Sequence, residues 1–302
     1  MKTIVVLGGG GFLGGCIERH FGSKGWRVIA VGHAAAGAQA DVRHVWNLPH
    51  PEFAHLLAIE QPDLVVNAAG RASVPASMVE PLADFEGSTL LTFRVLDDMR
   101  RRSPQAAFIQ ISSAAVYGNP VSLPTSEQAA IAPISPYGWH KRLSELIVQE
   151  HATQFGMRTA SLRLFSTYGP GLRRQVVWDL AQRALAEPGE ALVLHGCPED
   201  SRDFVHGTDL ALAVETVLAG ELAGELLEVV VDGEDVLDER GVGVDARVGG
   251  EETGAIGEQH QDVGLQQLGD QGGDAVVVAD ADLVVGDGVV LVDDRHDAEL
   301  HQ

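Results

Sequence analysis

The sequence predicts an α/β fold in which a doubly wound parallel sheet carries helices on both faces. Short apolar, β-branched runs typical of buried strands alternate with stretches of helical periodicity over the first two thirds of the chain. The first of these runs leads directly into a glycine-rich loop, residues 8–14, which is followed by a helix pattern. In such a sheet, ligands bind at the carboxyl ends of the strands.

The expected elements alternate from the N-terminus onward. Residues 3–7 predict a buried strand, and Ile17, His20 and Phe21 recur at helical spacing after it. Pro81 and Pro136 are each expected at the start of a long helix. The other expected strands are residues 27–31, 63–67, 107–111 and 159–164, and the expected helices after the first are residues 52–59, 81–102 and 136–155.

The loop over residues 8–14 predicts a Rossmann-type dinucleotide site. A helix N-terminus offers free N–H groups and the positive end of its dipole, which suits a pyrophosphate, and glycine permits the tight turn and the close approach of the phosphates. The loop fits both G-x-G-x-x-G and G-x-x-G-x-x-G, and the sequence does not choose between them. The candidate cofactor-binding residues of the loop are Gly8, Gly11, Phe12, Leu13 and Gly14.

The end of the second strand leaves NAD and NADP as alternatives. An acidic residue about 20 positions after the glycines would bind the ribose hydroxyls of NAD. The strand ends instead in Gly32 and His33, and no Asp or Glu lies between Glu18 and Asp41. No Lys or Arg close behind the strand would bind the extra phosphate of NADP. Asp41 is either an adenine neighbour or a solvated loop carboxylate.

A second group of residues indicates hydride-transfer chemistry. Ser112 and Ser113 follow the strand over residues 107–111, while Tyr137 and Lys141 lie four apart on an expected helix and therefore share one face. A neighbouring ammonium stabilises a phenolate, so Tyr137 can take the proton of a substrate hydroxyl as hydride leaves the same carbon. Lys141 would also hold the nicotinamide ribose, and Ser113 would hydrogen-bond to the reacting oxygen.

With these residues in view, residues 1 to about 220 resemble an extended short-chain dehydrogenase/reductase of the NAD-dependent epimerase/dehydratase type, which acts on nucleotide-diphosphate sugars. The matching stretches are GGGGFLG (8–14), NAAG (67–70), SSAAVYG (112–118), PYGWHK (136–141), LRLFSTYGPG (162–171) and RDFVHGTDLA (202–211). The resemblance implies NAD as the cofactor and a homodimer formed through the helices over residues 81–102 and 137–155.

The resemblance also implies roles for individual residues. The implied catalytic triad is Ser113, Tyr137 and Lys141. The residues implied to line the cofactor beyond the glycine loop are Asn67, Ala68 and Ala69. Arg202 would pair with the diphosphate of the sugar nucleotide, because a guanidinium matches phosphate oxygens, although an ion pair with Asp200 or Glu199 is the alternative. Ser166, where relatives often place Asn, would face the substrate.

Two alanines narrow the expected reaction. Members of the family that eliminate water carry an Asp-Glu pair where this chain has Ala114 and Ala115. The resemblance therefore favours a nucleotide-sugar epimerase that oxidises and re-reduces a sugar carbon. A related NAD(P)-dependent reductase or dehydrogenase is the first alternative, and a nucleotide-binding protein impaired in catalysis is the second.

The charge of the chain is concentrated in its C-terminal part. Residues 1–220 contain 18 Lys+Arg and 21 Asp+Glu, a net −3, whereas residues 221–302 contain 3 Arg, no Lys and 22 Asp+Glu, a net −19. The basic cluster Arg100-Arg101-Arg102 ends an expected helix, where cations suit the dipole, so no nucleic-acid partner is expected. Two cysteines, no apolar run of about 20 residues and no metal-ligand spacing predict a cytoplasmic protein with no membrane segment and no metal.

The composition also divides the chain into two regions. Residues 1–224 are expected to form the NAD(P)-binding domain with part of a substrate lobe. Residues 225–302 form an acidic tail rich in Gly, Val and Asp that lacks Phe, Trp, Tyr, Met and Pro, so the substrate lobe is expected to be reduced or aberrant. A change of reading frame near residue 225 is one hypothesis, and a partly disordered acidic appendage is the other.

Overall fold

The computed structural model describes residues 1–33, 40–123, 125–186, 192–195, 203–220, 222, 224–228, 276–277, 284–285 and 289–292. These residues fall into two compact units. The first unit takes its described residues from Met1–Gly169 and Phe204–Thr253, and the second from Pro170–Asp203 and Gly254–Gln302. The first unit contains almost all of the predicted site.

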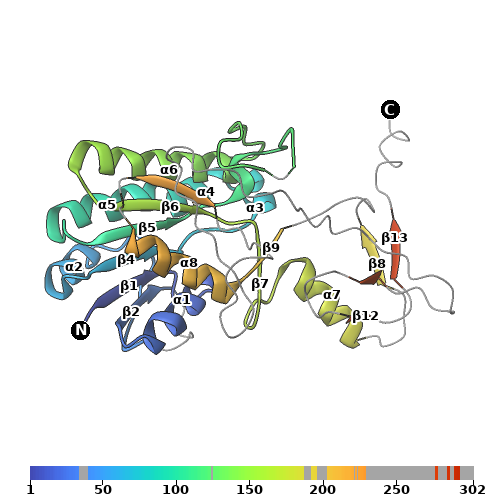
Figure 1. The fold of residues 1–302 in the computed structure, drawn as a ribbon, viewed down its shortest axis with the longest axis horizontal. Helices are drawn as coiled ribbons and strands as arrows, with labels where there is room; N and C mark the ends of the chain where they lie inside the picture. Colours follow the sequence, from blue (N-terminus) through green and yellow to red (C-terminus); the bar gives the residue numbers. More distant parts are fainter. Residues whose placement is uncertain are drawn as a thin grey trace, which may run out of the picture. The chain divides into compact units, whose positions relative to one another are not determined.

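A seven-stranded sheet forms the centre of the first unit, and every neighbouring pair of its strands is parallel (Figure 1). The strand order is β10-β6-β5-β4-β1-β2-β3, so the chain winds outward from β1 in both directions. The strands are β1 (Thr3–Leu7), β2 (Arg27–Gly32), β3 (Val42–Val45), β4 (Leu64–Asn67), β5 (Ala107–Ile111), β6 (Thr159–Arg163) and β10 (Glu225–Glu228). The fold class predicted from the sequence is confirmed.

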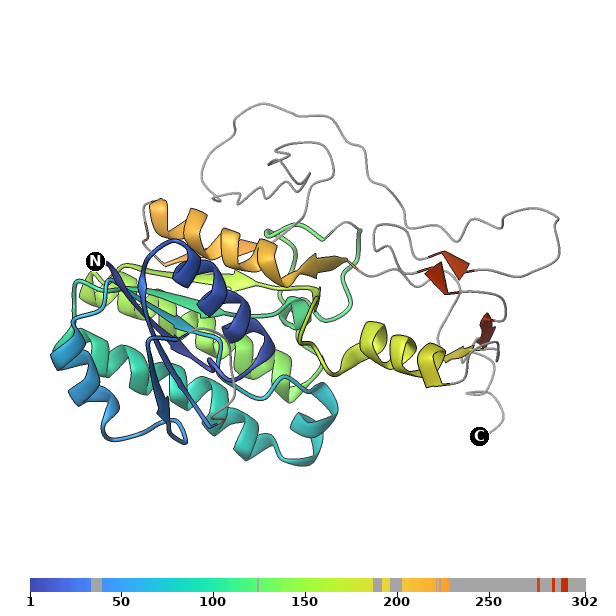
Figure 2. The same ribbon diagram turned by 90° about the horizontal axis from the view of Figure 1, so that it is seen from below.

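Helices cover both faces of this sheet (Figures 1 and 2). One face carries α1 (Phe12–Ser23) and α8 (Gly207–Ala219), and the other carries α2 (Phe53–Glu60), α5 (Leu91–Arg102) and α6 (Pro136–Phe155). The shorter elements of this unit are α3 (Val74–Val79), α4 (Pro81–Phe85), the π-helical turn η1 (Glu86–Leu90), the 3₁₀ turn η2 (Ala114–Val116), β7 (Ser166–Tyr168) and β9 (Phe204–His206).

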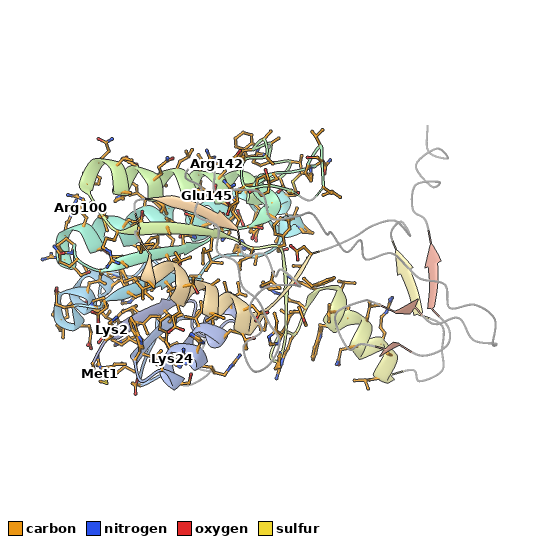
Figure 3. The ribbon with its side chains drawn as sticks, in the orientation of Figure 1. Met1, Lys2, Lys24, Arg100, Arg142 and Glu145 are labelled. Atoms are coloured by element: carbon orange, nitrogen blue, oxygen red, sulfur yellow. The ribbon has the colours of Figure 1, made fainter. Side chains whose placement is uncertain are left out.

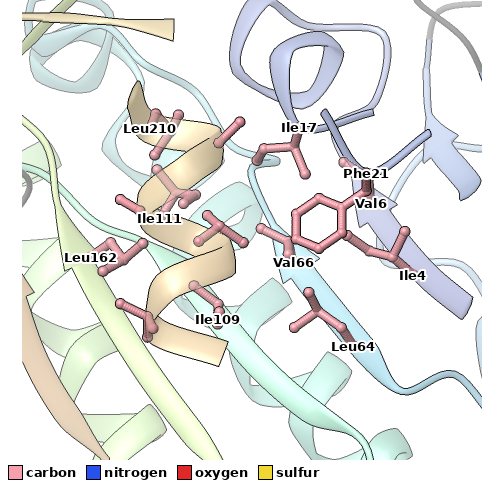
Figure 4. Packing of buried hydrophobic residues seen from close by; sticks show 14 of the residues in the cluster. Ile4, Val6, Ile17, Phe21, Leu64, Val66, Ile109, Ile111, Leu162 and Leu210 are labelled. Carbon is pink, nitrogen blue, oxygen red and sulfur yellow. The ribbon is translucent and has the colours of Figure 1, made fainter. Parts of the chain in front are cut away.

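The alternating side chains of the strands build two separate cores. Ile4 and Val6 of β1 pack with Phe21 on the face of α1 and α8, as Figure 4 shows, whereas Val5 and Leu7 pack against α2 and α5 on the other face. All four β1 side chains are fully buried. A strand that is buried on both faces has a continuous run of apolar residues, and β1 could therefore be predicted from the sequence.

The predicted elements agree closely with the structure. The strands expected over residues 3–7 and 107–111 and the helix over residues 136–155 have the observed bounds. The helix expected over residues 81–102 is interrupted by η1. The edge strand β3 was not predicted, because its four residues are only partly buried or exposed and it lacks a continuous apolar run. The helix α8 was not among the expected helices either.

The region that the composition sets apart, residues 225–302, begins with an edge strand of the sheet. Residues Glu225–Glu228 form β10, which pairs with β6 at the sheet edge. In the second unit, α7 (Gln175–Ala186) precedes β8 (Leu192–His195), and β8 pairs in parallel with β13 (Val289–Val292). The strands β11 (Val276–Val277) and β12 (Val284–Val285) pair with each other. The prediction of a reduced or aberrant substrate lobe falls mostly on residues that the structure does not describe.

Candidate active site

The parallel register brings three chain segments together at the carboxyl edge of the sheet. Leu7 of β1 is paired with Asn67 of β4, which is paired in turn with Gln110 of β5. The residues that follow these strands are the glycine loop, Ala68 and Ala69, and the Ser112-Ser113 pair. The order of the strands reverses beside β1, and this is the point at which a doubly wound sheet leaves a crevice for a ligand.

The glycine loop is packed so tightly that side chains are excluded. A Cβ on Gly14 would lie 2.3 Å from the Gly8 carbonyl oxygen, and a Cβ on Gly8, where φ is +82°, would lie 2.7 Å from the Ala68 carbonyl oxygen. The Gly8 N–H donates to Val31 O at 2.8 Å, and the Gly11 N–H donates to Gly8 O at 2.8 Å. The loop thus presents bare backbone at the start of α1.

The N-terminus of α1 fits a pyrophosphate. Helix α1 begins at Phe12, and its N-cap, Gly11, has no side-chain oxygen that could accept the first N–H groups. Phe12 and Leu13 are half-buried in the first turn. Free N–H groups at the positive end of a twelve-residue helix are suited to a phosphate pair. These residues therefore fit a dinucleotide cofactor.

Asn67 is held by a buried polar network that the sequence analysis did not predict. Its Nδ2 donates to Gln110 Oε1 at 2.9 Å, and its Oδ1 accepts the Ala69 N–H at 3.2 Å, so the side chain orders the Asn67-Ala68-Ala69 turn. Thr92 Oγ1 also donates to Gln110 Oε1, at 3.1 Å. The one available signal was a glutamine within the otherwise apolar run of residues 107–111.

Asp41 lies away from the glycine loop. Its Oδ2 accepts the Val28 N–H at 2.7 Å, and its own N–H donates to Val28 O. Val28 lies near the start of β2, four residues before Gly32 at the carboxyl end, which is roughly 13 Å along a strand. Asp41 is an exposed carboxylate directly before β3, which favours the second of the two alternatives that the sequence left open, a solvated loop carboxylate.

Tyr137 and Lys141 lie together on the first turns of α6. The Lys141 ammonium is 5.8 Å from the centre of the Tyr137 ring and donates to Ile111 O at 2.9 Å, and the lysine is only 7% exposed. The helix starts at Pro136 behind an N-cap serine, Ser135, whose Oγ accepts the Gly138 N–H. The predicted placement of an amine beside a phenol on one helix face therefore holds in the structure.

Ser113 lies on the loop that faces this end of α6. It is the N-cap of η2, and its Oγ accepts the Ala115 N–H at 3.2 Å, which leaves the hydroxyl proton for another acceptor. A Cβ on Gly138 would lie 2.5 Å from the Ala115 carbonyl oxygen. Glycine at position 138 therefore permits α6, with Tyr137, to approach the Ser113 loop closely.

Of the two predicted substrate residues, the structure describes Ser166 but not Arg202. Ser166 is half-buried at the start of β7, directly beyond the carboxyl end of β6, and is paired with Phe204 of β9. The neighbouring Leu164 carbonyl accepts the Ala114 N–H, so Ser166 follows the same edge of the sheet as the Ser113 loop. Arg202 lies outside the described residues.

A buried ion pair behind the candidate site was also not predicted. Arg163, at the end of β6, and Glu145, one turn after Lys141 on α6, are each 1% exposed and form two hydrogen bonds of 2.9 Å. Burial acts to lower the pKa of Arg163, but the hydrogen bonds and charge of Glu145 outweigh it and raise that pKa above its ordinary value. The sequence signal that could have revealed this pair was a charged residue, Glu145 or Arg163, at each of two positions expected to be buried.

The family of the chain follows from its match to known proteins. Residues 4–230 match the model of the NAD dependent epimerase/dehydratase family. The chain belongs to this family. It is therefore an NAD-dependent enzyme, and its cofactor is NAD, for which the glycine loop and the start of α1 are the fitting site.

Curated members of the family show the range of its chemistry. The chain is 30% identical over 232 residues to a UDP-glucose 4-epimerase of Streptococcus mutans, a match that covers 69% of each protein. It is 27% identical over 229 residues to a UDP-glucose 4-epimerase of Azospirillum brasilense, covering 69% of this chain and 66% of the relative. A UDP-glucuronic acid decarboxylase of Xenopus tropicalis is 30% identical over 224 residues, covering 69% of this chain and 52% of the relative.

Solved structures of the family share the fold. The UDP-glucose 4-epimerase of Thermotoga maritima, determined with UDP-glucose, superposes with a TM-score of 0.68 at 26% sequence identity, covering 76% of each chain. Among the residues that the structure describes, no helix is long and apolar enough to cross a membrane, and no cluster of three or more metal-ligating side chains occurs.

One further feature of the loop allows a prediction about pH. Glu18 of α1 is fully buried beneath Gly9, and its Oε2 accepts from Arg43 at 2.7 Å, while its Oε1 has no hydrogen-bond partner in the described part of the chain. Burial raises the pKa of Glu18, and the hydrogen bond and charge of Arg43 oppose that rise only in part. The contribution of Glu18 to the stability of the wild type therefore declines as pH rises from the ordinary pKa of a glutamate to the raised value.

We expect the Glu18→Gln variant to gain stability relative to the wild type as pH rises from 4 to 8. The amide does not titrate, whereas the loss of the Arg43 partner is a constant offset because arginine stays protonated throughout. The urea midpoints of the wild type and of Glu18→Gln are measured at several pH values, and the change of their difference with pH reports the gain in relative stability. A difference that is independent of pH would contradict the assignment.

Proposed function

We propose that this protein is a nucleotide-sugar epimerase in which Tyr137 is the base. The observation that carries the proposal is the buried Lys141 ammonium, which donates to the Ile111 carbonyl at the carboxyl end of β5 and lies 5.8 Å from the centre of the Tyr137 ring. Two curated relatives named as UDP-glucose 4-epimerases support the choice of reaction.

The residues of the chain have distinct tasks in this reaction. Lys141 supplies positive charge beside the phenol, which favours the phenolate. Tyr137 then removes the proton of the sugar hydroxyl and later returns it, while the Ser113 hydroxyl donates a hydrogen bond to the same oxygen. The glycine loop and the start of α1 would hold NAD, which would supply the hydride acceptor for oxidation of that carbon and the hydride donor for its reduction on the other face.

The loop after Ser113 supports epimerisation over dehydration. Ala114 and Ala115 begin the η2 turn at the site and carry no group that can donate or accept a proton. Elimination of water needs an acid and a base on neighbouring carbons. Oxidation and re-reduction of a single carbon, with NAD as the hydride acceptor and donor, needs only one proton-transferring group from the chain, which Tyr137 supplies.

The proposed substrate is a nucleotide-diphosphate sugar. The Thermotoga maritima structure holds UDP-glucose, which supports this class of ligand. We assign Ser166 to the sugar side of the crevice because of its place beyond β6, and Arg202 to the diphosphate by the resemblance.

Direct assay of nucleotide sugars tests the proposal. The purified chain is incubated with UDP-glucose and UDP-N-acetylglucosamine, and the products are separated and identified by NMR. We expect the C4 epimer to form without net consumption of the bound NAD. We also expect that no stoichiometric amount of added NAD or NADPH is needed. Stoichiometric consumption of added NAD or NADPH would replace the epimerase by the reductase or dehydrogenase, and protection against heat by NAD without turnover would favour a binding protein.

We also propose that the protein forms a homodimer through α4, α5 and α6. Trp139, Leu143 and Leu146 recur at helical spacing on α6 and are 54%, 38% and 43% exposed, and Leu82 of α4 and Phe93 of α5 are 68% and 42% exposed. Apolar side chains at this density on the paired helices support a contact with a second copy.

Replacing Leu146 by Glu is expected to convert the dimer to a monomer, because the carboxylate would be buried without a partner at the interface. Sedimentation velocity measures the change, and we expect at least a tenfold increase in the dissociation constant, or about 1.4 kcal/mol. Ile59→Glu is the matched control, since Ile59 is 65% exposed on α2. A wild-type chain that is monomeric at high concentration refutes the dimer.

We propose, finally, that the reading frame changes near residue 225 and that the acidic tail is a translation out of frame. The family match ends at residue 230, close to the position at which the composition changes. Sequencing the DNA and measuring the intact mass of the protein from its natural source test this. A mass that matches all 302 residues contradicts the frameshift and favours a true acidic appendage.

A further inference from the structure

We propose that the buried Glu145–Arg163 pair is a positioning device that clamps both ends of the Ser113 loop against the helix of Tyr137 and Lys141. The proposal rests on the function assigned to these three residues. It gives Glu145, Arg163, Ser112 and Tyr117 a role in aligning the site without contact with the reacting atoms.

Glu145 is the centre of the clamp. Its Oε1 accepts from Ser112 Oγ at 2.6 Å and from Arg163 Nε at 2.9 Å, and its Oε2 accepts from Arg163 Nη2 at 2.9 Å and from Arg142 Nη1 at 3.1 Å. Figure 3 marks Glu145 and Arg142 on α6. Both carboxylate oxygens are therefore satisfied, and the side chain is 1% exposed.

The start of the loop is tied to α6 at two successive residues. Lys141 donates to Ile111 O at 2.9 Å, and Glu145, four residues later on the same helix face, accepts from Ser112. Ser113 is the next residue. The two bonds therefore determine how far the Ser113 hydroxyl lies from the helix that carries Tyr137.

The end of the loop is tied to the same pair. Arg163 Nη1 donates to the Tyr117 hydroxyl at 2.7 Å, and the guanidinium lies 4.8 Å from the centre of the Tyr117 ring. Tyr117 is the C-cap of η2, the turn of which Ser113 is the N-cap. One ion pair thus holds the residue before the turn and the residue that ends it.

The physical cost of this arrangement suggests that its geometry matters. A buried ion pair contributes little net stability, since apolar residues of similar volume often serve as well. Catalytic groups, in contrast, must be held within about 0.5 Å of their productive positions by supporting hydrogen bonds. A rigid, doubly hydrogen-bonded arginine fork provides that support at a strand end.

Ser112→Ala and Tyr117→Phe test the clamp because each detaches one end of the Ser113 loop without breaking the Glu145–Arg163 ion pair. Each removes one hydroxyl and leaves all hydrogen bonds between Glu145 and Arg163 in place. Glu145→Gln is unsuitable as the main test because it leaves the Arg163 charge buried without a counter-charge. Thr159→Val is the matched control: it removes a hydroxyl, buried as deeply, that donates to Val148 O of α6 at 3.1 Å, at the opposite end of β6.

Two readouts are measured on the full chain with bound NAD. The first is epimerisation of UDP-glucose, for which we expect kcat to fall roughly tenfold in Ser112→Ala and Tyr117→Phe, with KM unchanged, because misalignment affects the chemical step. The second is hydrogen exchange of the peptide over residues 112–118, which we expect to accelerate in both variants. Thr159→Val is expected to change neither.

The outcomes separate this proposal from the proposed function. If the wild type turns over and kcat is unchanged in both loop variants, the clamp is refuted. If the wild type shows no turnover, the epimerase proposal fails, and the clamp is then tested by hydrogen exchange over residues 112–118 alone. Faster exchange over residues 112–118 in both loop variants, but not in Thr159→Val, then supports the clamp, and equal exchange in all four proteins overturns it.

Discussion

Tyr137→Phe is expected to reduce turnover by roughly 100-fold or more, the usual contribution of a positioned general base, while the affinity for NAD changes by no more than about twofold. The variant lacks the one group at the site that the proposed reaction uses to move a proton. It keeps the ring against which the Lys141 ammonium lies, 5.8 Å from its centre.

The structure gives reasons why the Tyr137→Phe variant should fold. Tyr137 is anchored by its backbone N–H, which donates to Ser77 Oγ at 3.1 Å, and α6 is capped by Ser135. Neither contact involves the phenol. A loss of activity therefore reports the chemical step and not a loss of structure.

The measurement combines an epimerase assay with NAD binding by calorimetry and a thermal melt. The Phe155→Leu variant serves as the control for a change in an aromatic side chain on the same helix, because Phe155 is 47% exposed and is the last residue of α6, at the end opposite Tyr137. Turnover at the wild-type rate in Tyr137→Phe would falsify the assignment of the base.

Gly14→Ala is expected to weaken NAD binding at least roughly tenfold and to lower the free energy of unfolding by about 1–3 kcal/mol, the range of an overpacked site. The added Cβ would lie 2.3 Å from the Gly8 carbonyl oxygen and 2.8 Å from Gly9 Cα. Because both are backbone atoms, the loop itself must move. A displaced loop no longer presents the start of α1 to the phosphates.

Gly87→Ala is the matched control, since the nearest atom to its added Cβ is Arg71 Cγ, at 3.9 Å. This variant is expected to keep the wild-type affinity for NAD. Isothermal titration and urea unfolding of both variants give the two quantities. Equal NAD affinity in Gly14→Ala and the wild type would show that the phosphates lie elsewhere.

Features that depend on residues close together in the chain could be predicted from the sequence. The run over residues 3–7 identified β1 because a strand covered on both faces has no polar position, and Pro136 with the helix pattern identified α6 over its full length. Tyr137 and Lys141 were predicted to share a face because helical periodicity alone decides the spacing of side chains along a helix.

Other features could not be found because their partners are distant along the chain. Asp41 was considered for the adenine site, but the register of β2 and β3 places it beside Val28, at the opposite end of the strand. Glu145 and Arg163 are 18 residues apart on different elements, and only the packing of α6 on β6 brings their charges together.

The sequence by itself determined the alternation of strands and helices and the shared helix face of Tyr137 and Lys141, because both depend on short-range periodicity within one element. The tertiary structure alone decided which strand ends meet, how closely Gly138 lets α6 approach the Ser113 loop, and which buried charges are paired. These depend on sheet register and on the exclusion of water, to which residues far apart in the chain contribute jointly.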